Sequence, residues 1–156
     1  MSGHIEPRDI DVYALVVARP NHPGLTPVSA DCAAITAARE AAVSAGSAPP
    51  LPAANGAPVC GFAWMGPAIT SGGIPLAQFA GLLDYVAGRV VVDRAGLTGR
   101  YEFALRFTSP FITAAGPDAP PDLFTAMPEQ LGLRLEATRA PVDTFAIDHI
   151  ERPAPN

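Results

Sequence analysis

VVVDRAGLTGRYEF, residues 90–103, is the most strongly patterned segment of the chain and decides the fold that we expect. Its three valines favour a short buried strand, and residues 95–99 favour a turn. From residue 101 to residue 107, apolar side chains alternate with polar or small ones, which is typical of a strand with one buried face. We therefore predict two strands that pair as a hairpin, with Asp93 at its corner.

Asp93 and Arg94 follow the valines directly, and two roles are open to them. An aspartate that enters a turn commonly accepts a backbone hydrogen bond and braces the turn. The alternative is general acid or base catalysis by Asp93, which needs a second titrating group and a cleft. We favour the brace. Asp148 and His149 point to opposite faces of their strand, so they cannot easily act on one substrate atom. We expect Asp148 to approach Asp93 or Arg100 across neighbouring strands, where an Asp–Arg pair would be structural.

Outward from this segment, hydrophobic periodicity and turn residues predict the remaining elements. The expected helix at 122–131 contains Pro128, whose ring opposes a regular helix, so either the helix kinks at Pro128 or its regular part begins near Met127. Ala140 and Pro141 predict a turn. The expected strands lie at 10–19, 59–73, 90–92, 101–107, 133–137 and 142–150, and the expected helices at 32–46, 76–87 and 122–131.

This order of elements predicts an α+β fold with a mostly antiparallel sheet and two packed helices. It is compatible with a ferredoxin-like βαββαβ order or with secretin or TonB-type N-terminal modules, preceded by an Ala-rich N-terminal helix. Proline is frequent between residues 47 and 58, which indicates a linker. We expect an N-terminal strand and helix at 1–46, the linker at 47–58 and the core at 59–156, in one folded unit.

Composition excludes several classes of function. The chain has 156 residues, enough for one domain with its own core. It contains no Lys, and its ten Arg stand against fifteen acidic residues, for a net charge of −5. Singly scattered Arg form no basic surface for nucleic acid. No apolar run approaches about eighteen residues, so we expect no membrane span and no signal peptide in this chain.

No set of residues has the spacing of a metal or cofactor site. His4 and His22 lie in an expected tail and turn without a second ligand nearby, so neither metal nor cofactor is expected. Ser71, Gly72 and Gly73 precede a helix and form at most a weak anion nest. Trp64 and Met65 lie between glycines and are either exposed anchors for a protein partner or part of the core.

Cys32 and Cys60 bracket the Pro-rich linker and leave three interpretations open. The first is a disulfide, which requires an oxidising compartment and would tie the Ala-rich helix to the core. The second is a pair of buried thiols. The third is a reactive thiol at Cys32, where a helix N-terminus favours the thiolate. We rank them in that order.

Five blocks of the chain resemble the "soil-associated protein" family of environmental bacteria, a domain of unknown function. The resemblance is to the C-terminal half of its members, and Ala95 and Pro128 depart from the family pattern. Members usually open with a signal peptide or membrane segment, so the resemblance implies a trimmed chain and an extracytoplasmic location, periplasmic or secreted. The blocks are VYALVVAR (12–19), CGF (60–62), VVVDRAGLTGRYEFAL (90–105), LFTAMPEQLGLRLE (123–136) and VDTFAIDHIERPAPN (142–156).

Two functional hypotheses follow from these observations. The first is a non-catalytic protein-interaction or sensor-type module that meets a protein partner through an exposed strand edge or the Trp64 loop. The second is a small hydrolase or thiol-redox enzyme that uses Asp93, His149 or Cys32, and it requires at least two of these groups within hydrogen-bond range of each other. The absence of a complete catalytic set in the sequence favours the first.

Overall fold

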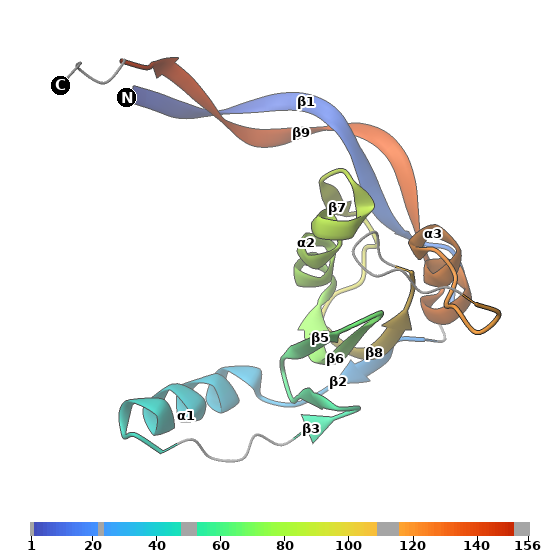
Figure 1. The fold of residues 1–156 in the computed structure, drawn as a ribbon. Coiled ribbons are helices and arrows are strands. Elements are labelled where there is room, and N and C mark those ends of the chain that lie inside the picture. Colours follow the sequence, from blue (N-terminus) through green and yellow to red (C-terminus); the bar gives the residue numbers. More distant parts are fainter. Residues whose placement is uncertain (1, 22–23, 48–52, 109–115, 152–156) are drawn as a thin grey trace.

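The computed structural model describes residues 2–21, 24–47, 53–108 and 116–151. The described part of the chain forms an α+β fold in which strands predominate (Figure 1). The strands are β1 (Ser2–Val17), β2 (Thr26–Val28), β3 (Ala53–Ala54), β4 (Ala57–Pro58), β5 (Phe62–Met65), β6 (Ala68–Pro75), β7 (Val91–Asp93), β8 (Arg100–Arg106) and β9 (Leu133–His149). The helices are α1 (Cys32–Ser44), α2 (Leu76–Ala87), α3 (Leu123–Ala126) and the π-helix η1 (Met127–Leu131).

The strands form three sheets instead of the one sheet that the ferredoxin-like or secretin/TonB-type order implies. One sheet has the order β7-β1-β9, a second has the order β2-β8-β6-β5, and β3 pairs with β4 alone. All strand pairs are antiparallel except β1 with β7. The predicted α+β class is confirmed, whereas the specific order is not, because the long strand β1 comes first and draws β7 and β9 into a sheet of their own.

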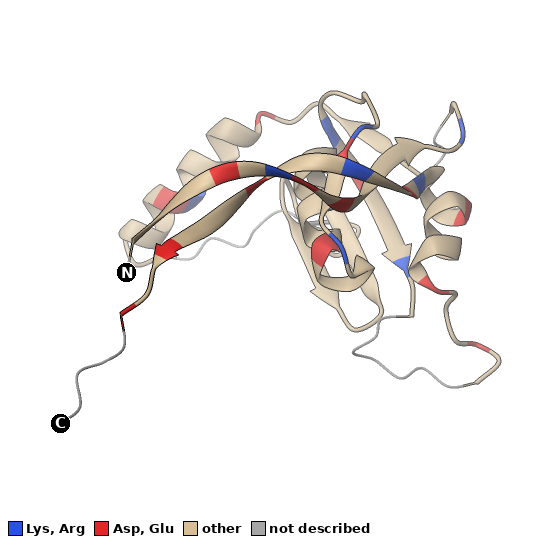
Figure 2. Cartoon of the chain, turned by 90° about the horizontal axis from the view of Figure 1, so that it is seen from above, with Lys and Arg blue, Asp and Glu red and all other residues tan. Residues whose placement is uncertain are grey.

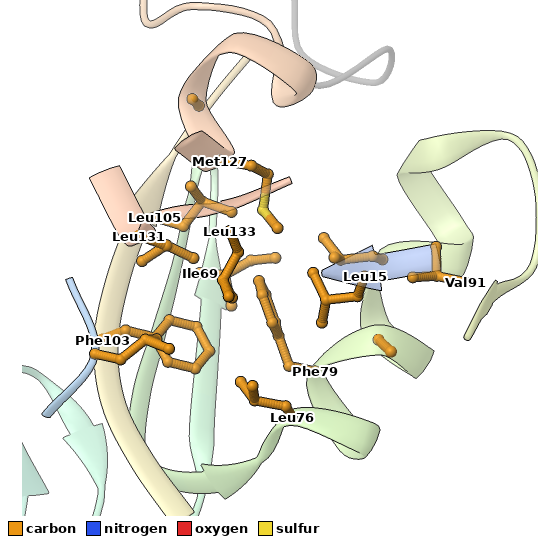
Figure 3. Close-up of a cluster of buried hydrophobic side chains, with 14 of the residues drawn as sticks. Leu15, Ile69, Leu76, Phe79, Val91, Phe103, Leu105, Met127, Leu131 and Leu133 are labelled. Atoms are coloured by element: carbon orange, nitrogen blue, oxygen red, sulfur yellow. The ribbon is translucent and has the colours of Figure 1, made fainter. Parts of the chain in front are cut away.

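The hydrophobic core lies among these two larger sheets, α2 and the α3–η1 segment (Figure 3). Phe79 of α2 is fully buried, and its ring centroid lies 4.5 Å from that of Phe103 on β8. Leu15 of β1 and Met127 at the start of η1 are also fully buried. Removal of such a side chain costs about 3 to 5 kcal/mol for an aromatic residue. The core therefore joins both ends of the chain to its middle.

The predicted hairpin at residues 90–107 is wrong. Val91 pairs in parallel with Tyr13 of β1, while β8 pairs with β6 and β2 in the other sheet. Tyr13 N donates to Val90 O and Arg94 N donates to Leu15 O, so β1 satisfies the backbone groups on that side of β7. The three valines signal burial correctly, but a short apolar run does not specify its partner strand.

The predicted turn at Ala140 and Pro141 is also wrong, because β9 runs without interruption from Leu133 to His149. Each of its residues from 133 to 147 faces a residue of β1, and Pro141 lies opposite Asp9. A proline is tolerated in an edge strand where its missing N–H would have pointed to solvent. The same register extends β1 to Gly3, and Ser2 pairs with His149 after a register shift, so β1 begins well before the strand that we expect at 10–19.

Pro128 produces the irregularity that the sequence predicts. The α-helical turn of α3 ends at Ala126, and Pro128 lies in the π-helix η1. The wider turn removes the clash between the proline ring and the preceding carbonyl groups. Gly132 then ends the helix in the left-handed conformation, with a φ of 71°. This segment places Met127 and Leu131 in the core.

The Pro-rich segment 47–58 contains more order than a linker would have. Asn55 and Gly56, with φ values of 52° and 79°, turn the chain between β3 and β4. Two consecutive positive φ values are typical of the tightest hairpin turns. Residues 48–52 and 109–115 lie outside the described residues, as does His22. The strand expected at 59–73 is the hairpin of β5 and β6.

Candidate interaction surface

The ends of β1 and β9 form a two-stranded arm that leaves the body of the protein (Figure 1). β7 contacts β1 only from Tyr13 to Leu15, so residues 2–11 of β1 pair with β9 alone among the described strands. We call residues 2–11 and 139–151 the arm. Both outer edges of this ribbon are free of any neighbouring strand in the described structure, and its two faces differ in chemistry.

One face of the arm continues the face that builds the core. Residues 3–17 of β1 pair with residues 147–133 of β9 without a register shift, so odd-numbered residues of both strands share one face. At the base of the ribbon, Leu15 and Leu133 on this odd face are fully buried. Farther out the same face leaves the body of the protein. Its apolar side chains there have no core to enter.

Three large apolar side chains are exposed on the odd face near the end of the arm. Ile5 is 71 % exposed, Phe145 60 % and Ile147 52 %. Ile5 lies directly opposite Phe145, and Ile147 lies opposite Gly3. A Cβ at Gly3 would meet the Phe145 ring, so this glycine leaves the ring room to lie across the strand pair. We call these three residues the tip cluster.

The opposite, even face carries a network of charged side chains. His4 contacts Asp148 through Nδ1 at 3.0 Å and Glu6 through Nε2 at 3.1 Å. Arg8 donates from Nε to Glu6 at 2.7 Å. The hydrogen bonds to Asp148 and Glu6 raise the pKa of His4 above its ordinary 6.5. The hydrogen bonds from Arg8 and His4 lower the pKa of Glu6 below 4.5.

The arm concentrates the negative charge of the molecule, and acidic residues lie along both of its strands (Figure 2). It contains two arginines, Arg8 and Arg139, and six carboxylates, a net charge of −4 out of −5 for the chain. Arg139 is paired with Asp11 at 3.2 Å. The six carboxylates are Glu6, Asp9, Asp11, Asp143, Asp148 and Glu151.

Asp9 and Asp143 are the carboxylates that the arm leaves uncompensated. Both lie on the odd face, where Asp143 is opposite Pro7 and Asp9 is opposite Pro141. Within the described chain, neither carboxylate takes part in an ion pair or a side-chain hydrogen bond. The odd face of the arm therefore presents an exposed apolar cluster next to two unpaired negative charges.

Two prolines interrupt the free edges of the arm. Tyr13 N and Leu15 O both bond to the β7 segment, which shows that odd residues of β1 direct their backbone groups away from β9. Their partners on β9 do the same, because opposite residues of an antiparallel pair share one hydrogen-bonding state. Pro7 and Pro141 are odd, so each removes one outward N–H donor. Such prolines hinder the addition of another strand to an edge.

Comparison with known proteins gives a family without an assigned activity. A family model described as "Protein of unknown function (DUF3738)" matches residues 1–150. The chain belongs to the DUF3738 family. No curated protein and no solved structure matches it significantly. The match spans β1 through β9, and so includes both strands of the arm.

In this DUF3738 protein the predicted ion pair among Asp93, Arg100 and Asp148 is not formed. Asp93 Oδ1 accepts a hydrogen bond from Ala95 N at 3.1 Å and closes a turn after β7. Arg100 donates to Gly73 O at 3.1 Å, in the second sheet. Asp148 lies on the arm beside His4. The expected approach is wrong because β7, β8 and the end of β9 do not neighbour one another.

Arg94, which follows Asp93, contributes through its backbone: its N–H bonds to Leu15 O. The residue that holds β7 most directly is Asp84 of α2, which the sequence analysis does not single out. Its Oδ1 accepts a hydrogen bond from Val91 N at 2.6 Å. Asp84 is the one charged residue of α2 and lies shortly before the valines, but any exposed helical aspartate presents the same pattern in a sequence.

A disulfide joins Cys32 to Cys60, with 5.5 Å between their Cα atoms. The interpretations as a reactive thiol or as buried free thiols are therefore wrong for this structure, since a sulfur in a disulfide is no thiolate. Cys32 is the only buried residue of α1. Arg39 of the same helix donates to Val59 O at 3.3 Å. Both contacts attach α1 to the chain just before β5.

The expected anion nest at Ser71 is closed from within. The buried Ser71 hydroxyl donates to Tyr101 O at 2.7 Å and accepts from the N–H groups of Gly73 and Ile74, both at 3.1 Å. No donor at Gly73 or Ile74 is left for an anion. The serine instead stabilises the register shift of β6 against β8, which falls between Gly72 and Ile74.

Trp64 and Met65 have different surroundings. Trp64 is half-buried, with its ring centroid 6.4 Å from that of Phe107 in the core. Met65, at the end of β5, is 75 % exposed. Met65 is therefore the more exposed of the two predicted contact residues.

The described residues contain no group of three or more potential metal ligands. No helix in the described ranges has the length and apolar character needed to cross a bilayer.

The structure places the three residues of the enzyme hypothesis in separate contacts. Asp93 closes a turn, Cys32 is in a disulfide, and His149 contacts Glu151 at the end of β9.

Proposed function

We propose that this DUF3738 protein is a non-catalytic protein-interaction module whose contact surface is the odd face of the arm. The observation that carries the proposal is the tip cluster: Ile5, Phe145 and Ile147 are all more than half exposed on a ribbon that leaves the body of the protein. Burial of an exposed side chain of this size contributes about 1.5 to 3 kcal/mol. Three neighbouring side chains can thus form the centre of a binding surface.

The same features favour an interaction role over catalysis. The arm combines an apolar centre with charged residues around it, as protein interfaces do. A sensor-type module would use this surface in the same way, by binding a partner in one state. The enzyme alternative requires Asp93, His149 or Cys32 to work in pairs, and the hydrogen bond of Asp93 and the disulfide of Cys32 already occupy two of these groups.

We further propose that the protein works outside the cytoplasm. The disulfide between Cys32 and Cys60 supports this location, because such bonds persist mainly in oxidising compartments. The resemblance to the "soil-associated protein" family, whose members carry export signals, points in the same direction. A partner would then be an envelope or secreted protein.

Site-specific photo-crosslinking in the host tests the proposed function. A photoreactive residue at position 145 is expected to give a discrete adduct, whereas the same residue at Tyr85, an exposed aromatic on α2, serves as the matched control. The adduct is identified by mass spectrometry, and purified partner should bind the Phe145→Ser variant more weakly. Equal labelling from both positions would count against the proposal. So would hydrolysis of a peptide or ester panel that Asp93→Asn abolishes.

A further inference from the structure

We infer that the arm recognises a cationic polypeptide segment, whose apolar side chains pack on the tip cluster and whose Lys or Arg side chains pair with Asp9 and Asp143. This inference rests on the proposed function and names the class of partner. Its basis is the combination, on one face, of three exposed apolar side chains and two carboxylates that have no partner in the described chain.

The charge of the arm selects the partner. With −4 on the arm, a second copy of the arm or an anionic membrane surface would meet like charge at close range. A cationic segment gains from the same field, which also steers its approach. Asp9 and Asp143 are the carboxylates most available to pair with a cation of the partner, because Glu6 is already paired with Arg8 and Asp11 with Arg139.

The spacing on the odd face defines what such a segment must present. Asp143 lies two residues from Phe145 along β9, which corresponds to about 7 Å in a strand. Asp9 lies four residues from Ile5 along β1, or about 13 Å. A fitting segment therefore carries neighbouring apolar side chains, followed by two basic side chains at these distances. An apolar residue at every other position of an extended chain, and then Lys at every other position, meets this requirement.

The partner binds to the face of the ribbon and not to its edge. Pro7 on β1 and Pro141 on β9 each remove an outward N–H donor, so a strand added along either edge would leave a carbonyl without its bond. The affinity for the partner then depends on side-chain contacts. Substitutions in the tip cluster, or of Asp9 and Asp143, should therefore weaken binding.

Binding of synthetic peptides measured by fluorescence anisotropy tests the inference. The probe is a labelled peptide with the order Leu-Ser-Leu-Ser-Lys-Ser-Lys. One control peptide has Glu in place of both Lys, and another has Ser in place of both Leu. We expect the first peptide to bind, the Glu peptide not to bind, and the Ser peptide to bind more weakly. Added salt should weaken the binding, as expected for exposed charges.

Variants of the protein link the binding to the odd face. Phe145→Ser should weaken the affinity for the Lys peptide roughly tenfold, as expected for a central apolar anchor. Asp9→Asn together with Asp143→Asn should weaken it roughly two- to fivefold per carboxylate and reduce its dependence on salt. Asp118→Asn, an exposed carboxylate on the body of the protein, is the matched control and should change neither.

Several results would overturn the inference. They are the absence of Lys-peptide binding, equal binding of the Glu peptide, affinity that is insensitive to Phe145→Ser, binding of the protein to vesicles of anionic lipid through the arm, or arm-dependent dimerisation without peptide binding. The proposed function is judged separately by the crosslinks from position 145. An adduct whose crosslinked peptide contains no Lys or Arg, for example, would support the interaction role and exclude a cationic segment as the ligand.

Discussion

His4 and Asp148 are separated by 144 positions in the sequence, yet His4 Nδ1 lies 3.0 Å from the Asp148 carboxylate across the arm. The other ring nitrogen of His4 lies 3.1 Å from Glu6. One imidazole therefore links the beginning of β1 to the end of β9. The link holds together the part of the ribbon that carries the tip cluster on its opposite face.

We predict that pairing at the end of the arm is most stable between about pH 4.5 and pH 6.5. The pKa of His4 is raised, so its contribution is complete below 6.5 and is lost as the pH rises through the folded-state pKa. The pKa of Glu6 is lowered, so its contribution is complete above 4.5 and is lost as the pH falls through the folded-state pKa. Hydrogen exchange of the arm amides measures this window.

The variant Asp148→Asn tests the role of Asp148 in this pH dependence. An NMR titration of the His4 ring measures the pKa of His4 in the parent protein and in the variant. Loss of the carboxylate removes the largest cause of the raised pKa, so the His4 midpoint should fall toward 6.5. A midpoint unchanged by the substitution would mean that the contact between His4 and Asp148 is absent in solution.

We predict that Asp84 contributes more to stability than Asp93. Asp84→Ala leaves the Val91 N–H without its acceptor where β7 enters the core, which costs about 1 to 3 kcal/mol. Asp93→Ala removes a hydrogen bond in an exposed turn, worth about 0.5 to 1.5 kcal/mol. Urea unfolding of both variants gives the comparison, and Asp84→Asn, which keeps an acceptor, should recover part of the loss. Equal losses for the two alanine variants would contradict this ranking.

The sequence predicts local elements here better than it predicts their partners. The helix at 76–87 and the irregularity at Pro128 follow from short-range chemistry and are found in the structure. The pairing of β7 with β1 joins residues 78 positions apart, and the valines carry no information about that choice. The chemistry of Pro141 predicts a turn, whereas its place in an edge strand depends on how the whole sheet assembles.

We predict that reduction of the disulfide releases α1 while the core stays folded. Only Cys32 of this helix is buried, so little besides the disulfide and Arg39 attaches it to the described structure. Loop closure over 28 positions contributes about 3 to 4 kcal/mol to the free energy of unfolding. Hydrogen exchange after reduction, or in Cys32→Ser with Cys60→Ser, should show loss of protection in α1 and not in α2. Arg39→Met with the disulfide intact is the control. Protection of α1 that survives reduction would refute the prediction.

Two glycines should respond to alanine in opposite directions. A Cβ at Gly72 would lie 2.2 Å from Pro58 O, so backbone must move, and we expect a loss of about 1 to 3 kcal/mol. Gly81 lies inside α2 with nothing within 4 Å of its added Cβ, so Gly81→Ala should raise stability by about 0.5 to 1 kcal/mol. Thermal unfolding of both variants tests the pair, and a stable Gly72→Ala would mean that β4 and β6 do not approach as closely as described.

The candidate surface was less accessible to sequence analysis than the fold. Phe145 and Ile147 have the pattern of ordinary strand hydrophobics, and Ile5 precedes the first expected strand. Only the register of β1 against β9 places the three together outside the core. Trp64 and Met65 stand out in the sequence because they lie between glycines, and the structure leaves Trp64 half-buried near Phe107 and Met65 exposed. Exposure is a property of the whole structure, so composition and spacing do not decide which apolar side chains reach solvent.

We predict that Pro7 and Pro141 prevent the free edges of the arm from pairing with another strand. Pro7 and Pro141 occupy odd positions, where the backbone of each strand points outward, so each leaves a gap in a free edge. Pro7→Thr together with Pro141→Thr would restore both outward N–H donors on a long exposed ribbon, and such edges pair with one another. In analytical ultracentrifugation the double variant should therefore sediment as a larger, self-associated species, while the parent protein keeps its oligomeric state under the same conditions.

Ala137→Thr is the control for this double variant. Position 137 is also odd and already has its N–H, so this change adds a threonine without adding a donor. If the control self-associates equally, side-chain chemistry and not the restored donors explains the effect. If the double variant shows no self-association, the prolines do not protect the edges, and a partner strand added along the arm would again be possible.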